Sequence, residues 1–290
     1  MPQLTIILTK HISTLIYIKK LKESLSVINN MNCKICKKNA EFFLKTTIMK
    51  KYDVSYFLCK NCGFIQTEEP YWLKEAYNDP INTSDTGIFT RNILCSKITS
   101  NIIYFLFNKK DVFLDYAGGY GIFTRIMRDI GFDFYWNDPY CQNIFAKGFE
   151  DKLENKKYAL ATCFEAFEHF EKPLEQIESI FKKTENILFS TELLPRKISS
   201  EKIQSWRYLG REHGQHICFY SKKSLQYLSE IFGYKLYSNG YYFHLLTKRD
   251  LNPFIFKFLC LSPNYYFFRI LSALRVKSKT RPDSLLISKK

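Results

Sequence analysis

Residues 111–138 read DVFLDYAGGYGIFTRIMRDIGFDFYWND, and this stretch decides the fold. The apolar run at residues 112–114 predicts a short buried strand, and the glycines after it predict a tight turn. From Ile122 onward, apolar residues recur at helical spacing until Gly131, a residue suited to end a helix. A second predicted strand, residues 132–136, leads to Asp138. Strand, turn, helix and strand in this order indicate a parallel α/β sheet.

The glycine-rich turn favours a nucleoside ligand. Glycines let a ligand approach the backbone, the following helix presents its N–H groups, and an acid after the next strand accepts ribose hydroxyls. Asp138 is placed to be that acid. A dinucleotide-binding fingerprint would need a third glycine where Thr124 stands. Asp115, at the end of the first strand, suits a cationic ligand better than a pyrophosphate.

These residues resemble the first motif of the class I S-adenosylmethionine-dependent methyltransferases, roughly Asp-x-Gly-x-Gly-x-Gly. Asp115, Gly119 and Gly121 match the motif, and Ala117 replaces its first glycine with little extra volume. The resemblance implies that Asp115 lies near the methionine amino group and that Asp138 holds the ribose. It also implies that the turn under the cofactor comprises Ala117, Gly118, Gly119 and Gly121. A purely structural turn without a cofactor is the alternative.

The composition is that of an ordinary globular protein. Of the 290 residues, 46% are apolar and 24% charged, which suits one large core and a small accessory module. The net charge of +15 suggests attraction to acidic or nucleotide-linked substrates, membrane surfaces or nucleic acid. No apolar run approaches the ~18 residues of a spanning helix. Nine cysteines without a secretory signal favour the reducing cytoplasm and metal ligation over disulfides.

Two C-x2-C pairs indicate a metal site formed by Cys33, Cys36, Cys59 and Cys62. Two residues between thiolates allow both sulfurs to turn toward one tetrahedral ion. Strand-like residues 42–48 and 52–57 lie between the pairs, so we expect a zinc-ribbon-like module over residues 31–68. The Zn²⁺ is expected to be structural, because four thiolates leave no open position for chemistry. Four free or redox-active cysteines are the alternative.

Two segments flank this module. Residues 1–30 carry apolar and basic patches without a small-residue cleavage site, so we interpret them as a weakly packed extension rather than a signal peptide. Translation that begins at Met31 would exclude them from the native protein. Residues 69–110 predict a helical connector, in which the polar segment 83–92 is either a lid over the cofactor or a plain surface loop.

Residues 158–163 predict another buried strand and lead into FEAFEHF at residues 164–170. A similar Glu-His pair follows the fourth strand in methyltransferases of this class, and the matching residues here are Glu165, Glu168, His169 and Pro173. The segment is expected to face the same crevice as the glycine turn. Glu165 is therefore a candidate cofactor-binding or catalytic acid. His169 is either part of the site or a helix-start residue held by local hydrogen bonds.

The remaining elements complete the sheet. A helix at residues 174–181 and a strand at 187–191 follow, and the strand-like runs 234–237 and 241–246 flank an Asn-Gly hairpin signal. Methyltransferases of this class end in such an antiparallel strand. The expected fold is therefore α/β, with a Rossmann-like, mostly parallel seven-stranded sheet ending in an antiparallel hairpin over residues 111–248, plus the small N-terminal zinc ribbon.

Residues 206–221 read WRYLGREHGQHICFYS and contain the most unusual polar cluster of the chain. His213 or His216 could act as the base that removes a proton from the methyl acceptor. A second metal site and a structural role beneath the following helix are alternatives. The segment also resembles part of the bacterial deoxysugar C-methyltransferases, which similarly carry an N-terminal cysteine-ligated zinc module.

The tail, residues 249–290, is aromatic and then basic. Its aromatic part either contacts a membrane surface or a lipid-linked sugar or, as we expect, packs outside the sheet, and residues 276–290 are expected to be mobile. The sequence therefore predicts a cytoplasmic methyltransferase acting on a nucleotide sugar or surface-glycan precursor. The basic charge leaves RNA or protein as a rival substrate, although no RNA-binding signature is present. A non-catalytic binding protein on the same fold is the third possibility.

Overall fold

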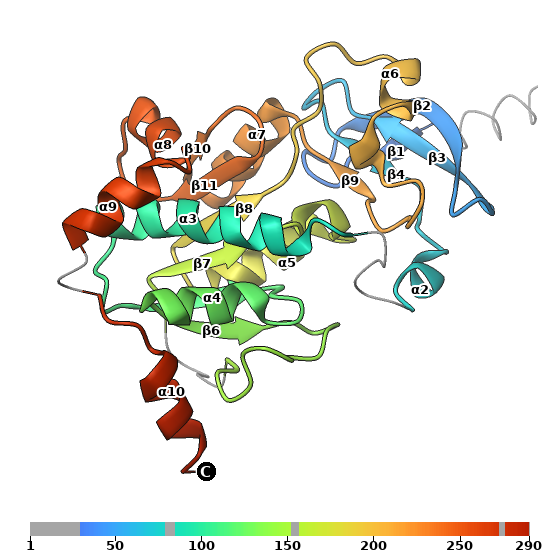
Figure 1. Cartoon of the computed structure of the whole chain (residues 1–290). Helices are drawn as coiled ribbons and strands as arrows, with labels where there is room; N and C mark the ends of the chain where they lie inside the picture. Colours follow the sequence, from blue (N-terminus) through green and yellow to red (C-terminus); the bar gives the residue numbers. More distant parts are fainter. Residues whose placement is uncertain (1–29, 79–84, 152–156, 273–275, 290) are drawn as a thin grey trace, which may run out of the picture.

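The computed structural model describes residues 30–78, 85–151, 157–272 and 276–289. Two sheets organise these residues (Figure 1). The larger has six strands in the order β10-β11-β8-β7-β5-β6, and the smaller has five in the order β1-β2-β3-β4-β9. Of the predicted extension, only Asn30 lies within the described residues, and the first two residues of the predicted lid segment 83–92 also lie outside them.

The six-stranded sheet confirms the expected α/β architecture. The neighbouring strands β8, β7, β5 and β6 are parallel, β11 pairs antiparallel with β8, and β10 pairs antiparallel with β11. The strands are β5 (Val112–Tyr116), β6 (Asp133–Asn137), β7 (Leu160–Cys163), β8 (Asn186–Ser190), β10 (Lys235–Ser238) and β11 (Phe243–Thr247). The predicted strands and the Asn-Gly hairpin therefore lie where the sequence placed them.

The prediction of seven strands is wrong, because six strands form this sheet within the described residues. Beyond β6 there is a single parallel bridge between Trp136 and Glu150. The Trp136 N–H donates to the Phe149 carbonyl at 2.8 Å, and the Asp151 N–H donates to the Trp136 carbonyl at 2.7 Å. Residues 138–149, which connect β6 to this bridge, contain no helix, and the pairing ends after the single bridge.

Helices cover both faces of this sheet. Adjacent strand residues point to opposite faces, and Phe113 and Leu114 accordingly belong to separate apolar clusters. The Phe113 face is covered by α3 (Ile88–Leu106), α4 (Ile122–Ile130) and α8 (Pro253–Leu259). The Leu114 face is covered by α5 (Pro173–Phe181), α7 (Lys222–Phe232) and the smaller sheet. Shorter helical segments are α2 (Leu73–Ala76), η1 (Phe167–His169), α6 (Ser200–Gln204) and η2 (Arg207–Leu209).

The smaller sheet is antiparallel and contains the cysteine pairs. Its strands are β1 (Asn30–Asn32), β2 (Asn39–Ile48), β3 (Tyr52–Leu58), β4 (Ile65–Thr67) and β9 (Cys218–Phe219). The fifth strand comes from far along the chain, because Ile65 pairs with Phe219 and Gln66 with Cys218. Buried residues of both sheets form one continuous apolar cluster. The cysteine module and the larger sheet are therefore parts of one packed body.

The tail forms three helices, α8, α9 (Asn264–Ser272) and α10 (Thr280–Ile287). Phe256 and Leu259 of α8 are buried, while Phe254 is 77% exposed. The expectation of a mobile end is wrong for residues 276–289, since Asp283 of α10 is buried and pairs with Arg128 of α4 at 2.8 Å. Contact of the tail with a membrane surface stays a prediction. Among the described residues, no helix has the length and apolar character needed to cross a bilayer.

Candidate functional site

A cavity of about 1010 Å³ lies at the carboxyl ends of β5, β6 and β7. One end is formed by the glycine turn and the other by the histidine-rich segment. The predicted site residues that line it are Asp115, Ala117, Gly118, Gly119, Asp138, Glu165, His213 and His216. Gly121 does not line the cavity. The parallel sheet therefore brings together residues that the sequence had assigned to cofactor and to catalysis.

Asp138 and the glycine turn lie in direct contact. The Gly119 N–H donates to Asp138 Oδ2 at 2.9 Å. The N–H groups of Tyr140 and Cys141 donate to Oδ1 at 2.8 and 2.9 Å. These three bonds fix the carboxylate at the cavity wall before any ligand arrives, and Oδ2, which accepts only one of them, keeps a lone pair for a further donor.

Three turn residues have different steric demands. A Cβ on Gly118 would lie 2.7 Å from Asp115 Oδ2, so this position accepts only glycine without rearrangement. Gly121, the N-cap of α4, has φ of 83° and supports the turn rather than the ligand. Ala117 has φ of 57°, a left-handed conformation that costs an L-residue about 1–2 kcal/mol. The replacement of the motif's first glycine is therefore small in volume but strained in backbone.

Asp115 is a buried carboxyl group held by two threonines. Thr124 Oγ1 donates to its Oδ2 at 2.8 Å, and Thr162 Oγ1 donates to its Oδ1 at 3.2 Å. Burial raises the pKa of Asp115 to about 7, despite the two hydroxyl groups that favour its charged form. In the sequence, Thr124 was notable only because it stands where a dinucleotide-binding fingerprint would need a glycine. Its position one helical turn into α4 is what brings it to Asp115.

Glu165 occupies the end of β7 with an unusual backbone. Its φ is 51°, and its carboxylate accepts a hydrogen bond from Ser190 Oγ at 2.8 Å, while its own N–H donates to the same hydroxyl at 2.8 Å. Arg91 Nε lies 3.9 Å from Oε2. Burial raises the pKa of Glu165, and the Arg91 charge opposes that increase. The side chain is therefore locked at the centre of the cavity.

Two histidines of the cavity differ in tautomer. His216 Nδ1 lies 2.6 Å from the Tyr208 carbonyl, which can only accept, so this nitrogen carries the proton. His213 Nδ1 accepts the Gln215 N–H at 3.1 Å, so its proton resides on Nε2. Burial lowers the pKa of both imidazoles, which keeps them neutral. His216 thus retains an unprotonated Nε2, whereas His213 offers an N–H.

Sequence reasoning noted Glu168 and His169 as motif matches but did not assign Glu168 to the site. His169 lines the cavity, and its Nδ1 lies 2.9 Å from the Tyr77 hydroxyl. The His169 and His216 rings meet edge to face with their centroids 4.9 Å apart. Glu168 is fully buried behind them. No pattern within either segment predicts this meeting, because the two segments are far apart in the sequence.

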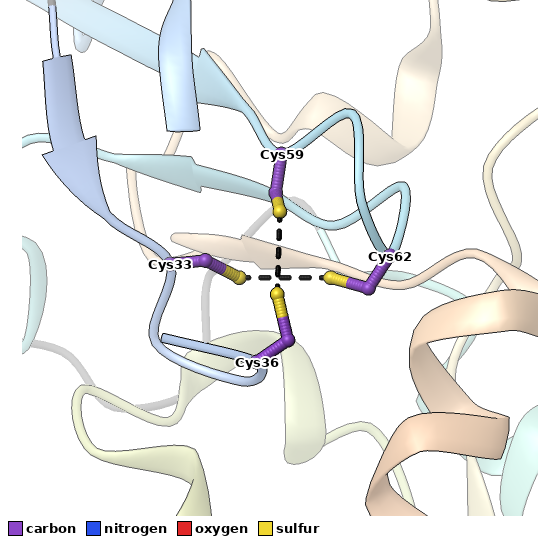
Figure 2. Close-up of side chains that lie close together, drawn as sticks. All are labelled: Cys33, Cys36, Cys59 and Cys62. Carbon is purple, nitrogen blue, oxygen red and sulfur yellow. Dashed lines mark hydrogen bonds between the residues drawn. The ribbon is translucent and has the colours of Figure 1, made fainter. Parts of the chain in front are cut away.

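The four predicted metal-binding cysteines converge on one point (Figure 2). Their Sγ atoms lie 3.6 Å apart in the Cys33–Cys62 pair and 3.4 Å apart in the Cys36–Cys59 pair. These distances are far from the ~2.05 Å of a disulfide and close to the spacing of four sulfurs about 2.3 Å from one ion. A hydrogen bond from Cys62 lowers the pKa of Cys33 to about 5. The cluster could hold a metal ion.

A glycine turn, a strand-end acid and a cavity beyond parallel strands define an α/β protein that binds a nucleoside cofactor. Residues 90–239 match the family described as "Methyltransferase domain", which covers just over half of the chain. The chain belongs to this family and is an S-adenosylmethionine-dependent methyltransferase.

Solved methyltransferases are similar to the chain at low identity. CalO1, a methyltransferase in calicheamicin biosynthesis, is 10% identical with a TM-score of 0.37, over 53% of this chain and 54% of its own. Magnesium protoporphyrin IX methyltransferase from Synechocystis PCC 6803 is 12% identical with a TM-score of 0.38, over 60% of this chain and 87% of its own. The chain thus spans about half of the first protein. No curated protein matches the chain.

Proposed function

We propose that the protein transfers the methyl group of S-adenosylmethionine to a hydroxyl group of a nucleotide sugar or a related surface-glycan precursor. The observation that carries this proposal is the two-ended cavity, which has room for a nucleoside cofactor and a second polar molecule. Lys74 and Arg207 line it and are exposed, and among the described residues neither forms an ion pair. Such cations suit the phosphates of a nucleotide-linked substrate.

The carboxylates of Asp115 and Asp138 support the placement of the cofactor at the glycine-turn end of the cavity. The buried carboxylate of Asp115 suits the cationic amino end of S-adenosylmethionine, and Asp138 is placed to accept hydrogen bonds from the ribose hydroxyls. Gly118 has no Cβ, so Asp115 and Trp136 can pack directly against the backbone of the turn beneath the cofactor. These assignments use residues that face one continuous cavity.

The acceptor end centres on the unprotonated Nε2 of His216. Methyl transfer from a sulfonium needs an aligned nucleophile, and a hydroxyl nucleophile must also lose its proton. The His216 lone pair can accept that proton directly, or it can bind an ion that promotes loss of the proton. His213, with its proton on Nε2, is suited to orient the acceptor as a hydrogen-bond donor, and Glu165 lies between the two ends of the cavity.

The four-cysteine cluster fits a structural Zn²⁺. All four donors are thiols, three of them are fully buried, and no coordination position would remain for a substrate. Binding of the ion would stabilise the smaller sheet, whose fifth strand adjoins the histidine-rich segment. A reducing compartment, such as the cytoplasm, would keep these thiols available.

The direct test is transfer of a labelled methyl group from S-adenosylmethionine to a panel of nucleotide sugars, with total RNA and cell protein as parallel acceptors. We expect label in a nucleotide sugar and none in RNA or protein. Label in RNA or protein alone would replace the proposed substrate class. Binding of S-adenosylhomocysteine without transfer to any acceptor would support a non-catalytic role instead.

A further inference from the structure

Three side chains at the histidine end of the cavity form a group that the proposed function leaves unexplained: Glu168, His169 and His216. One potential ligand atom from each lies within 4.8 Å of the other two. Glu168 and His169 are neighbours in η1, and the Ile217 N–H donates to the Glu168 carbonyl at 2.9 Å, which ties the His216 segment to η1. The backbone therefore holds the three residues together without help from their side chains.

Glu168 is the unusual member of this group. It is 0% exposed, and within the described residues neither carboxylate oxygen has a hydrogen-bond partner and no lysine or arginine lies within ion-pair distance. Burial and the negative charge of Glu165 disfavour its charged form and raise its pKa, although the Tyr208 and Thr191 side chains are close enough to favour that form. A buried carboxyl group with so little hydrogen bonding is costly. A cation beside it would satisfy both oxygens and relieve the repulsion from Glu165.

Both histidines are arranged as metal ligands usually are. His216 Nδ1 donates to the Tyr208 carbonyl at 2.6 Å, and His169 Nδ1 lies 2.9 Å from the Tyr77 hydroxyl. Ligand histidines commonly engage the second ring nitrogen in this way, which directs Nε2 to the ion. The Tyr208 carbonyl fixes the His216 tautomer. The Tyr77 hydroxyl is able to accept from His169 Nδ1 in the same manner.

We propose that Glu168, His169 and His216 bind a divalent transition-metal ion at the acceptor end of the cavity. Two imidazoles and one carboxylate are a ligand set of catalytic zinc and non-haem iron sites, and they leave coordination positions for a substrate. His169 and His216 line the cavity, so those positions face the acceptor. The site is separate from the four-cysteine cluster.

The proposal rests on the proposed function and specifies how the acceptor is activated. A hydroxyl group bound to the ion is held in place, and its pKa falls. Its proton passes to solvent, its oxygen forms a bond to the methyl carbon, and the S–CH3 bond of the sulfonium breaks to leave neutral S-adenosylhomocysteine. The lone pair of His216 then binds the ion instead of the proton.

The test is cobalt binding to the full chain, dialysed against a chelator under conditions that leave one zinc per chain. We expect one Co²⁺ to bind with the weak visible bands of nitrogen and oxygen ligands and without thiolate-to-cobalt charge transfer. Glu168→Gln should weaken Co²⁺ binding at least about tenfold. Glu171→Gln is the matched control, because Glu171 is exposed in the same cavity and should bind Co²⁺ as the unchanged protein does.

His216→Ala provides a second variant, with circular dichroism and S-adenosylhomocysteine affinity as checks on folding. The absence of a second metal equivalent, or unchanged Co²⁺ affinity in both variants, would overturn the site. Undiminished methyl transfer by the metal-depleted protein would overturn the role of the ion. Cobalt binding is measured without cofactor or acceptor, so its failure is distinct from failure of the substrate panel.

Discussion

The two ends of the cavity are built in different ways. The cofactor end is one continuous stretch, from Asp115 through the glycine turn to Asp138, and most of its hydrogen bonds lie within that stretch, although Thr162 also donates to Asp115. The histidine end joins Tyr77, η1 and residues 208–216, which meet only through tertiary contacts. β9 begins two residues after His216 and pairs with β4, which begins three residues after Cys62 of the second cysteine pair. The histidine end therefore depends on the cysteine cluster, whereas the cofactor end does not.

Loss of the four-cysteine cluster should give the largest difference between the two ends of the cavity, because it should affect the histidine end and spare the cofactor end. Cys59→Ser removes one thiolate, which loosens β4 and with it β9, so we expect kcat to fall about tenfold to hundredfold. Affinity for S-adenosylhomocysteine should change far less. Zinc content, kcat and calorimetric binding measure the effect, with Cys260→Ser, a cysteine outside the cluster, as the control. Equal losses of kcat and affinity would show that the ends do not behave independently.

Replacement of Asp138 should instead lower the affinity for the cofactor and leave kcat nearly unchanged. Asp138→Ala removes the acceptor of three backbone N–H groups and the proposed ribose ligand, so cofactor affinity should fall roughly thirtyfold, or ~2 kcal/mol. The value of kcat at saturating cofactor should stay within about threefold. Asp129→Ala, on the exposed side of α4, is the control. A loss of kcat with unchanged affinity would place Asp138 outside the cofactor site.

The pH dependence of binding should also distinguish the ends. The pKa of Asp115 is raised to about 7, so the carboxyl group is neutral below this pH and charged above it. Affinity for the cationic amino end of S-adenosylhomocysteine should therefore rise between pH 6 and 8, by up to about tenfold. The pKa of His169 is lowered to about 3, so this imidazole at the histidine end stays neutral over this range. Calorimetry should give a flat profile for Asp115→Asn; a flat profile in the unchanged protein would refute the assignment.

The smallest expected effect concerns the strained turn. Ala117→Gly relieves the left-handed backbone but adds freedom to the unfolded chain, so the free energy of unfolding should rise by about 0.5 kcal/mol. Ala76→Gly, in helix α2, should instead lower it by about 1 kcal/mol. Denaturant unfolding compares the two. A similar loss of stability in both would mean that Ala117 is not strained.

Much of the fold and of the candidate site could be predicted from local sequence patterns. The glycine turn, the Asn-Gly hairpin and the paired cysteines are local signals, and each element lies where its pattern placed it. The edge of the sheet was not predictable, because a single bridge at Glu150 leaves no strand-length pattern. The ordered structure of the tail was not predictable either, because it depends on the pairing of Asp283 with Arg128. Glu168 was missed as a site residue because its significance comes from burial next to a distant histidine.

We expect one S-adenosylmethionine to lie against the glycine turn, with its ribose hydroxyls on Asp138. Calorimetric titration of the full chain with S-adenosylhomocysteine tests it most directly, with Asp138→Ala measured in parallel. We expect one equivalent to bind per chain, with affinity reduced roughly thirtyfold in the variant. No binding to the unchanged protein, or equal binding to both proteins, would contradict it.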